Sequence, residues 1–246
     1  MAKRARLDTA LVERGLFPSR EQAQRAVMAG QVRAGDRVLT KSSELIAPDT
    51  DLSVEAPQKY VGRGGLKLEG ALDRFRINPA RQTCLDIGAS TGGFTDCLLQ
   101  RGAARVYAID VGHGQLAWKI RSDPRVVVGE HLNARHLTRE EIPEPIDLCV
   151  IDVSFISLTL ILPGAFALLT PSGMLLALIK PQFELEQQDV GRGGIVRDAA
   201  LHDKAQRKVE AFVRRAGHEV VGITPSAITG TDGNQEFFLC ARKQSA

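Results

Sequence analysis

Four charged side chains stand at the ends of expected helices and strands in this chain, and their types are suited to proton transfer. Lys67 follows a glycine-rich segment, Asp152 and Lys180 end two expected strands, and Glu236 begins the last strand. A lysine amine accepts a proton only when it is neutral, and partial burial beside a second cation favours that state. Carboxylates can orient an amine or a hydroxyl. Together the four residues suggest general-base chemistry on a weakly acidic group.

Each of these residues also has an ordinary structural explanation. The segment "LLALIKPQFE", residues 175–184, is a buried apolar run that ends in Lys180 and then proline. Taken alone, Lys180 marks the point where a strand meets water. Lys67 alone is a solvated helix lysine, and Asp152 alone is a helix cap. Only the position of all four at matching element ends favours a catalytic role.

The elements that must position these side chains alternate between strands and helices. Strands are expected at 83–88, 105–110, 126–128, 146–152, 174–180, 219–225 and 235–242, with helical segments between most of them. This alternation predicts an α/β fold with a doubly wound, mostly parallel sheet that is covered on both faces. In such sheets ligands bind outside the carboxyl ends of the strands. The helix after Asp198 should bury a stripe of Leu201, Ala205, Val209, Phe212 and Ala216.

A glycine-rich loop, "LDIGASTGGF" at 85–94, follows the first of these strands. It is not a dinucleotide fingerprint, because Ser90 occupies the second glycine position. The loop resembles the S-adenosylmethionine loop of class I (Rossmann-like) methyltransferases. That resemblance implies cofactor binding by Asp86, Gly88, Ser90, Gly92 and Gly93. Asp110, which closes the next strand, would accept hydrogen bonds from a ribose diol, although it could also be a strand-end cap. Asn133 is a candidate for the adenine edge.

The segment after the fourth strand indicates the methyl acceptor. Amino-methylating enzymes commonly have Asn/Asp-Pro-Pro-aromatic here, whereas this chain has Asp152-Val-Ser-Phe, and it lacks the Pro-Cys nucleophile of cytosine carbon methylation. The four charged residues instead resemble the Lys-Asp-Lys-Glu tetrad of ribose 2′-O-methyltransferases, the FtsJ-like group. The resemblance implies that Lys180 is the base for attack of a ribose hydroxyl on a sulfonium methyl group. Lys67 would be the second cation, with Asp152 and Glu236 as orienting groups.

The amino-terminal residues predict two short helices and a hairpin. Ser19 is a good N-cap with Gln22 three residues on, and Gly15 and Gly30 are helix stops. The order and spacing of Arg6-Leu7-Asp8, Ser19-Arg20, Ala23 and Gly30-x-Val32 resemble the S-four RNA-binding domain, a small α+β module. Six basic residues are candidates for phosphate contacts, namely Arg4, Arg6, Arg20, Arg25, Arg33 and Lys41.

Taken end to end, the chain resembles the TlyA family of rRNA cytidine 2′-O-methyltransferases, some of which are named hemolysins. The resemblance rests on both modules and on "VGRGGLKL", "DVSFIS", "IKPQFE" and "GRGGIVRD". It implies an S-four domain at 1–59, a linker around 57–65 and a methyltransferase domain at 60–246, with S-adenosylmethionine as cofactor and ribosomal RNA or ribosomal subunits as partners. Two alternatives are a membrane-active hemolysin and a non-catalytic ribosome-assembly protein.

Composition and charge agree with a globular RNA-binding protein. Of 246 residues, 43% are hydrophobic and 25% charged. Residues 1–41 contain nine Lys/Arg and four Asp/Glu, a net charge of +5, while the other residues contain 23 and 25, a net charge of −2. Four scattered cysteines without a Cys-x-x-Cys pair indicate reduced thiols, no metal site and a cytoplasmic location. The apolar stretch at 158–179 is interrupted by Pro163, Pro171 and Gly173, which favours a helix and a strand over a membrane span.

Overall fold

A computed structural model describes residues 4–55 and 58–244, with the exception of the side chain at position 192. Pro57 of the expected linker therefore lies outside the described residues. The chain forms two compact units, Met1–Lys59 and Tyr60–Ala246, and each is described by itself.

The amino-terminal unit contains two helices and two small antiparallel sheets. Its elements are β1 (Ala5–Arg6), α1 (Leu7–Glu13), α2 (Arg20–Met28), β2 (Val32–Ala34), β3 (Arg37–Val38), β4 (Leu45–Ile46) and β5 (Leu52–Val54). β1 pairs with β4, and β2 lies between β3 and β5. The Ser19 hydroxyl accepts the Gln22 amide at 3.3 Å, which confirms the predicted cap of α2. The expected hairpin is β2–β3, turning at Gly35 and Asp36.

A small apolar core holds this unit together. Leu7 and Leu11 of α1 pack with Ala23 and Val27 of α2 and with Val32 of β2, all of them buried. The spacing of four residues along each helix places each pair on one face. The strands β4 and β5 were not expected from the sequence, because each has only two or three residues and no clear alternation.

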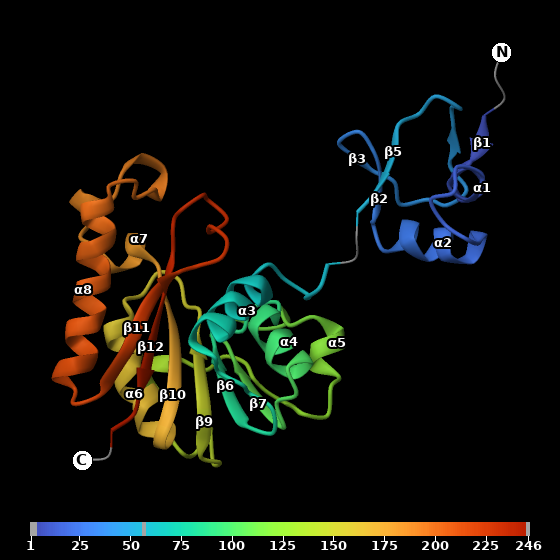
Figure 1. The fold of residues 1–246 in the computed structure, drawn as a ribbon. Coiled ribbons are helices and arrows are strands. Elements are labelled where there is room, and N and C mark those ends of the chain that lie inside the picture. Colours follow the sequence, from blue (N-terminus) through green and yellow to red (C-terminus); the bar gives the residue numbers. More distant parts are fainter. Residues whose placement is uncertain (1–3, 56–57, 245–246) are drawn as a thin grey trace. The chain divides into compact units, whose positions relative to one another are not determined.

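The larger unit is built on a sheet of seven strands (Figure 1). The strands are β6 (Thr83–Ile87), β7 (Arg105–Ile109), β8 (Val126–Gly129), β9 (Ile146–Ile151), β10 (Leu169–Ile179), β11 (Glu219–Pro225) and β12 (Phe237–Arg242). Their order is β11-β12-β10-β9-β6-β7-β8; β12 runs antiparallel to both β10 and β11, and the other neighbouring strands are parallel. The doubly wound, mostly parallel α/β fold is therefore confirmed.

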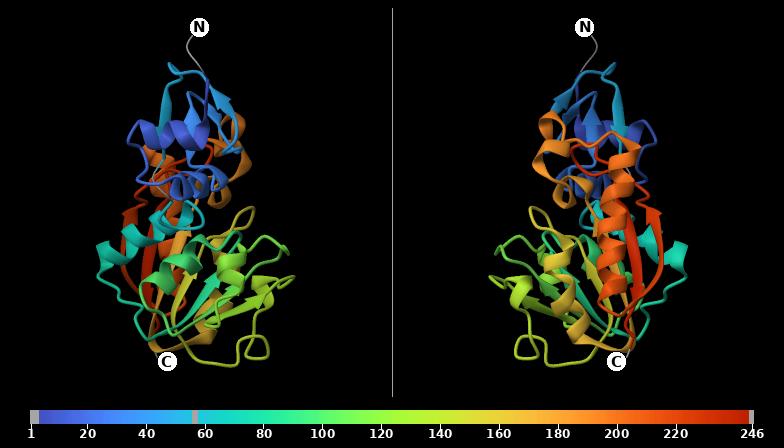
Figure 2. Two further views of the ribbon diagram at one scale, coloured as in Figure 1. Left: turned by 90° about the vertical axis from the view of Figure 1, so that its right-hand side faces the viewer. Right: turned by 90° about the vertical axis from the view of Figure 1, so that its left-hand side faces the viewer.

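Two helical layers cover the sheet, as the two views of Figure 2 show. One layer contains α3 (Gly64–Phe75), α4 (Gly93–Gln100) and α5 (Trp118–Arg121). The other contains α6 (Leu162–Leu168) and α8 (Ala199–Arg215). Strand residues alternate between the two cores: Cys84 faces α3 and α4, whereas Leu85 and Ile87 face α6. All four cysteines are buried and unpaired by disulfides.

Shorter helices complete the connections on the carboxyl edge of the sheet. They are η1 (Ala134–His136), η2 (Leu158–Leu160), α7 (Pro181–Glu184), η3 (Gln187–Asp189) and η4 (Arg192–Gly194). The chain visits β6, β7 and β8 on one side and then returns to β9 on the other side of β6. The topological switch point thus lies between the ends of β6 and β9, where the Asp152 amide donates to the Ile87 carbonyl at 2.9 Å.

Two local expectations change. Gly64 and Gly65 belong to the first turn of α3, so the segment between the two units is shorter than the predicted linker. In α8 the buried stripe is Ala205, Val209 and Val213, whereas Ala216 lies past the helix end and is exposed. The predicted stripe was wrong at the carboxyl end of the helix. A step of four residues from Val209 leads to Val213, whereas the prediction stepped from Val209 to Phe212 and then to Ala216.

The apolar stretch at 158–179 forms η2, α6 and β10. Leu168 ends α6 and β10 begins at once, with a shift of register between Leu169 and Met174 that accommodates the Pro-Ser-Gly segment. Within the described residues, no helix is both long and apolar enough to cross a membrane.

Candidate functional site

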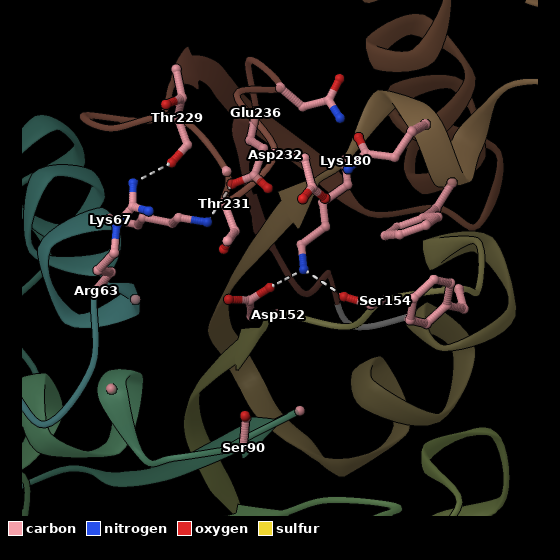
Figure 3. Close-up of a pocket in the computed structure, with 18 of the residues that line it drawn as sticks. Arg63, Lys67, Ser90, Asp152, Ser154, Lys180, Thr229, Thr231, Asp232 and Glu236 are labelled. Carbon is pink, nitrogen blue, oxygen red and sulfur yellow. Dashed lines mark hydrogen bonds and ion pairs between the residues drawn. The ribbon is translucent and has the colours of Figure 1, made fainter. Parts of the chain in front are cut away.

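Two lysine–carboxylate pairs lie in one cavity of about 600 Å³, which we call the tetrad cavity (Figure 3). Lys180 Nζ lies 2.6 Å from Asp152 Oδ1, and Lys67 Nζ lies 2.6 Å from Glu236 Oε2. The structure therefore brings together all four residues that the sequence placed at element ends. Each lysine is next to a carboxylate rather than to the other lysine.

The Lys180 pair stands at the switch point. Asp152 follows β9 and Lys180 follows β10, and these neighbouring parallel strands bring their carboxyl ends to one edge. Lys180 also donates to Ser154 Oγ at 2.9 Å, so its amine is held between two acceptors. Both side chains remain partly accessible to solvent. The amine is therefore fixed in direction and still reachable from the cavity.

The Lys67 pair is more deeply buried. Lys67 is 8% exposed in α3, and Glu236, immediately before β12, is 2% exposed. A side chain at Gly230 would approach Glu236 Oε1 to 2.7 Å, so the loop before β12 closes over this carboxylate. In the same wall, Arg63 donates to the Thr229 carbonyl at 3.2 Å. The pair fixes the position of the Glu236 carboxylate within the cavity wall.

A second cavity of about 520 Å³, which we call the loop cavity, lies beside the glycine-rich loop. Of the predicted cofactor residues, Gly88, Ser90, Asp110 and Asn133 line it. Both cavities share five lining residues, namely Gly88, Ser90, Asp152, Ser154 and Phe155. A ligand in the loop cavity would therefore reach the Lys180–Asp152 pair directly.

Gly88 is required where the two cavities meet. Its φ is +88°, and a Cβ there would lie 2.2 Å from the Asp152 carbonyl oxygen. No other residue fits this close approach of β6 and β9. Gly92, with φ +95°, instead lies against Leu116 and Ile120 and lines neither of these cavities, so its place in the loop is explained by packing. Gly93 lines the tetrad cavity.

Asp110 holds the glycine loop together. Its carboxylate accepts the Ser90 amide at 2.8 Å and the Gly112 amide at 2.7 Å. These contacts are those of a strand-end cap, one of the two roles that the sequence allowed for Asp110. Ser90 has a φ of 48°, in the left-handed region, and the bond from its amide stabilises that conformation. Asn133 caps η1 by accepting the Arg135 amide at 3.1 Å.

Asp86 lies beneath the loop. It is fully buried, and Thr95 Oγ1 donates to its Oδ2 at 2.6 Å. Burial raises the pKa of the Asp86 carboxyl to about 7, and the nearby Asp152 and Asp110 also raise it, while the Thr95 hydrogen bonds lower it. Asp86 is not among the residues that line either cavity. Direct contact of this carboxylate with a cofactor stays a prediction from the sequence.

Some residues of the site were not singled out from the sequence. Phe155 is 90% exposed with a φ of 64°, and its ring packs on Phe183 with centroids 5.0 Å apart. A positive φ is strained for a bulky residue, and strain of this kind collects at functional sites. The motif "DVSFIS" contains both Ser154 and Phe155, but no pattern in the sequence reports a backbone angle.

Asn234 joins two loops over the tetrad cavity. Its Oδ1 accepts the Val196 amide and its Nδ2 donates to the Gly194 carbonyl, both at 2.9 Å. The second GRGG segment, at 191–194, is thereby tied to the loop before β12, and Gly193 and Gly194 line the cavity. Asn234 is buried, and no sequence motif marks it as a site residue. Only its contacts in the structure identify it.

In the amino-terminal unit, the six candidate phosphate-binding residues differ in their partners. Arg6 and Arg20 both donate to the buried carboxylate of Asp8 at 3.0 Å. The hydrogen bond from Arg6 and those from Gln24 and Arg20 hold the pKa of Asp8 well below its usual range. Arg25 pairs with Glu21 at 3.6 Å and Arg33 with Glu55 at 2.5 Å. Arg4 and Lys41 are exposed and form no ion pair with any residue that the structure describes.

Comparison with known proteins agrees with this division into two modules. The family model "FtsJ-like methyltransferase" matches residues 60–243, and the model "S4 domain", the S-four domain named above, matches residues 5–52. A seven-stranded sheet, a glycine loop at its switch point and this match define the larger unit as an enzyme of the methyltransferase class.

Full-length relatives narrow this class. A Mycobacterium tuberculosis protein named 16S/23S rRNA (cytidine-2′-O)-methyltransferase TlyA is 46% identical over 247 residues, which is 100% of this chain and 92% of the relative. Hemolysin A of Brachyspira hyodysenteriae is 43% identical over 94% of this chain and 97% of its own length. A solved Streptococcus thermophilus structure, described as a candidate hemolysin, has 43% identity and a TM-score of 0.76, covering 100% of this chain and 90% of that one. The chain belongs to the FtsJ-like methyltransferases and, among them, to the TlyA family.

Proposed function

We propose that this protein transfers a methyl group from S-adenosylmethionine to a ribose 2′-hydroxyl of ribosomal RNA, at a cytidine, in the cytoplasm. The observation that supports this most strongly is the Lys180–Asp152 pair, 2.6 Å apart, where the loop cavity opens into the tetrad cavity. A cofactor in the first cavity and a nucleotide in the second would meet at this pair. The substrate is that named for the Mycobacterium tuberculosis relative.

The loop cavity fits S-adenosylmethionine. Gly88 lines this cavity and presents its backbone there without a side chain. Asp110 keeps lone pairs for a ribose diol besides the two amides it accepts. Ile109, Leu132 and Val153 supply an apolar lining for an adenine. When bound, the cofactor supplies a methyl group on a positively charged sulfur, which is open to attack by an oxygen nucleophile.

We assign the proton transfer to Lys180. Its amine, when neutral, accepts the proton of the 2′-hydroxyl, and the ammonium that forms is stabilised by Asp152 at 2.6 Å. Ser154 Oγ, 2.9 Å away, fixes the direction of the amine. The buried Lys67–Glu236 pair orients Glu236 in the cavity wall, where a carboxylate oxygen can accept a hydrogen bond from the ribose.

RNA binding is assigned to both units. The exposed Phe155 ring, which lines both cavities and packs on Phe183, offers a flat surface on which a base can stack. Exposed and half-exposed cations of the amino-terminal unit, including Arg4, Arg6, Arg20 and Lys41, offer contacts to phosphates.

The test is Lys180→Ala, measured as methyl transfer to ribosomal RNA. Turnover should fall by about 10²–10⁴-fold, the usual range for loss of a positioned base. Affinities for S-adenosylmethionine and RNA should change little, because the amine acts mainly in the transition state. Lys204→Ala is the matched control, since Lys204 is an exposed lysine paired with Asp189 that lines neither cavity. Turnover near the wild-type level in Lys180→Ala would refute the assignment.

A second candidate function comes from the name of a relative, Hemolysin A. Leakage of a dye from liposomes measures this activity directly. We expect no leakage from the purified protein at concentrations that saturate methyl transfer. Leakage that persists in the Lys180→Ala variant would favour a separate membrane-active function. RNA binding without methyl transfer in the wild-type protein would instead favour a non-catalytic ribosome-assembly role.

A further inference from the structure

Glu184 is a buried carboxylate that the proposed reaction does not use. It ends α7, it is 3% exposed, and it is not among the residues that line either cavity. Its Oε2 accepts the Ser157 hydroxyl at 2.6 Å, and its Oε1 accepts the Leu158 amide at 2.7 Å. Lys208 of α8 lies 3.3 Å from Oε2 and donates to the Glu184 carbonyl at 2.6 Å. One side chain therefore joins α7, α8 and the segment that follows β9.

That segment is "DVSFIS", residues 152–157, and it meets α7 along its whole length. Three contacts join the two in chain order: Lys180 with Ser154 at 2.9 Å, the ring of Phe183 with that of Phe155 at 5.0 Å between centroids, and Glu184 with Ser157. Figure 3 shows the first of them. Phe155 thus lies between two residues that are fixed by hydrogen bonds to the two ends of α7.

The backbone of Phe155 requires such anchoring. Its φ of 64° is strained for a bulky residue, and its side chain is 90% exposed, so burial of the ring does not stabilise this conformation. A strained backbone persists only where the surrounding contacts fix it. The bond from the Leu158 amide to Glu184 is buried, whereas the bond from Lys180 to Ser154 is exposed, so Glu184 is the stronger anchor.

Stability alone does not call for a carboxylate at this position. Well-packed apolar side chains often stabilise a buried site as well as an ion pair does. The two oxygens of Glu184 instead accept hydrogen bonds from two successive residues of one segment. Hydrogen bonds depend on direction, so this arrangement fixes the course of the segment in a way that an apolar contact would not.

We propose that Glu184 is a positioning residue for the acceptor nucleotide: it holds the segment after β9 so that the Phe155 ring stands where a base of the RNA can stack on it. The inference rests on the proposed function for the identity of the substrate and for the stacking role of Phe155. Glu184 itself touches neither the substrate nor the cofactor, and no bond is made or broken at its carboxylate.

The experiment is steady-state methyl transfer by the full chain, with ribosomal RNA varied at saturating S-adenosylmethionine. Glu184→Ala removes both acceptors, and kcat/KM for RNA should fall by about 10–100-fold, as expected for a displaced substrate contact. Glu184→Gln keeps an acceptor for the Leu158 amide and gains an amide that can donate to Ser157, so kcat/KM should stay within about threefold of wild type. The RNA dissociation constant, measured without cofactor, should rise in Glu184→Ala and not in Glu184→Gln.

A second substitution separates positioning from a role in stability alone. Phe155→Ala removes the ring that Glu184 is proposed to position. If Glu184 acts through this ring, adding Glu184→Ala to Phe155→Ala should lower kcat/KM by less than about threefold more. A carboxylate that only stabilised the fold would cost the same factor with and without the ring, and that result would overturn the inference.

Glu141→Ala is the matched control. Glu141 accepts the hydroxyl and the amide of Thr138, both at 2.9 Å, and lines neither cavity, so the same two kinds of hydrogen bond are lost away from the site. Its kcat/KM should equal that of wild type. If Glu184→Ala does not fold, Ser157→Ala removes one of the two bonds from the other side, and kcat/KM should fall by about 3–10-fold when Phe155 is present and not when it is absent.

The outcomes separate this inference from the proposed function. Wild-type kcat/KM in Glu184→Ala, or a Glu184→Gln variant as impaired as Glu184→Ala, would overturn the inference and leave the proposed function intact. If the wild-type protein does not methylate ribosomal RNA, the proposed function is wrong, and the inference fails with it.

Discussion

Both units of this protein place cations beside a buried carboxylate, but they expose the cations differently. In the amino-terminal unit, Asp8 is fully buried while the side chains of its partners Arg6 and Arg20 are 46% and 56% exposed. In the larger unit, the side chains of Glu236 and its partner Lys67 are 3% and 10% exposed. An exposed guanidinium that is paired with a buried carboxylate can still bind a phosphate. A buried amine can contact only a ligand that enters its cavity. The difference separates a binding surface from a reaction site.

The largest effect should follow from breaking the buried pair. Lys67→Ala leaves Glu236 without its cation in a buried position, so the free energy of unfolding should fall by about 3–5 kcal/mol. Urea denaturation of the full chain measures this loss. The double variant Lys67→Met with Glu236→Leu should regain much of the stability but not the methyl transfer. If the free energy of unfolding of Lys67→Ala falls by less than about 1 kcal/mol, the pair contributes no more to stability than an ordinary surface ion pair.

Removing the charge of Asp8, the buried carboxylate of the amino-terminal unit, should lower stability by a smaller amount. Hydrogen bonds from Arg6 lower the pKa of Asp8, so its stabilising contribution is present above the unfolded pKa and is lost as the pH falls through the folded one. Stability should therefore decline below pH about 4, near the unfolded value.

Asp8→Asn should remove about 1–3 kcal/mol at neutral pH and flatten this acid dependence. Unfolding curves at several pH values, followed by hydrogen exchange in α1 and α2, provide the measurement. An acid dependence that is as steep in Asp8→Asn as in wild type would show that other carboxyls cause it. Asp36→Asn, an exposed turn substitution, is the control.

Ser154 tests how finely the reaction site is arranged. Ser154→Ala removes one acceptor of the Lys180 amine but leaves the ion pair to Asp152. Methyl transfer should fall by about 3–10-fold, the value of one hydrogen bond, with unchanged cofactor affinity. Ser122→Ala, whose hydroxyl bonds only within the turn after α5, should have no effect. A loss as large as that of Lys180→Ala would assign Ser154 a direct role in the reaction.

The smallest expected effect is on RNA affinity. Arg20→Ala should make the logarithm of the RNA affinity fall less steeply with the logarithm of salt concentration, by about one unit of slope. This corresponds to about a fourfold change in relative affinity between 50 and 200 mM salt. Arg214→Ala is the matched control, a half-exposed arginine paired with Glu210 in the larger unit. Equal slopes for both variants would mean that Arg20 is only a structural partner of Asp8.

Several predictions from the sequence agree with the structure because their signals are local. The Ser19 cap, the hairpin at Gly35 and the mostly parallel sheet depend on neighbouring residues or on a regular period. Asp152 and Lys180 could be placed at one edge because the carboxyl ends of neighbouring parallel strands must meet there. These inferences needed no knowledge of strand order beyond a parallel sheet.

Other features could not be predicted from the sequence because they depend on which distant segments meet. Lys67 and Glu236 are 169 residues apart, and their contact requires β12 to insert beside β10. Asp86 and Gly92 lie in the recognised loop motif, yet one is buried beneath it and the other packs against α5. Phe155 is exposed by a backbone angle that no residue pattern reports.

By itself, then, the sequence determined the class of fold, the set of charged residues and the basic character of the amino-terminal unit, since composition and period are properties of the chain. The tertiary structure decided which lysine meets which carboxylate and how deeply each pair is buried. It also decided that Asp86 has no cation beside it among the described residues. Burial and pairing set the electrostatic energy of a charge, and both arise only when strands and helices from distant parts of the chain pack together.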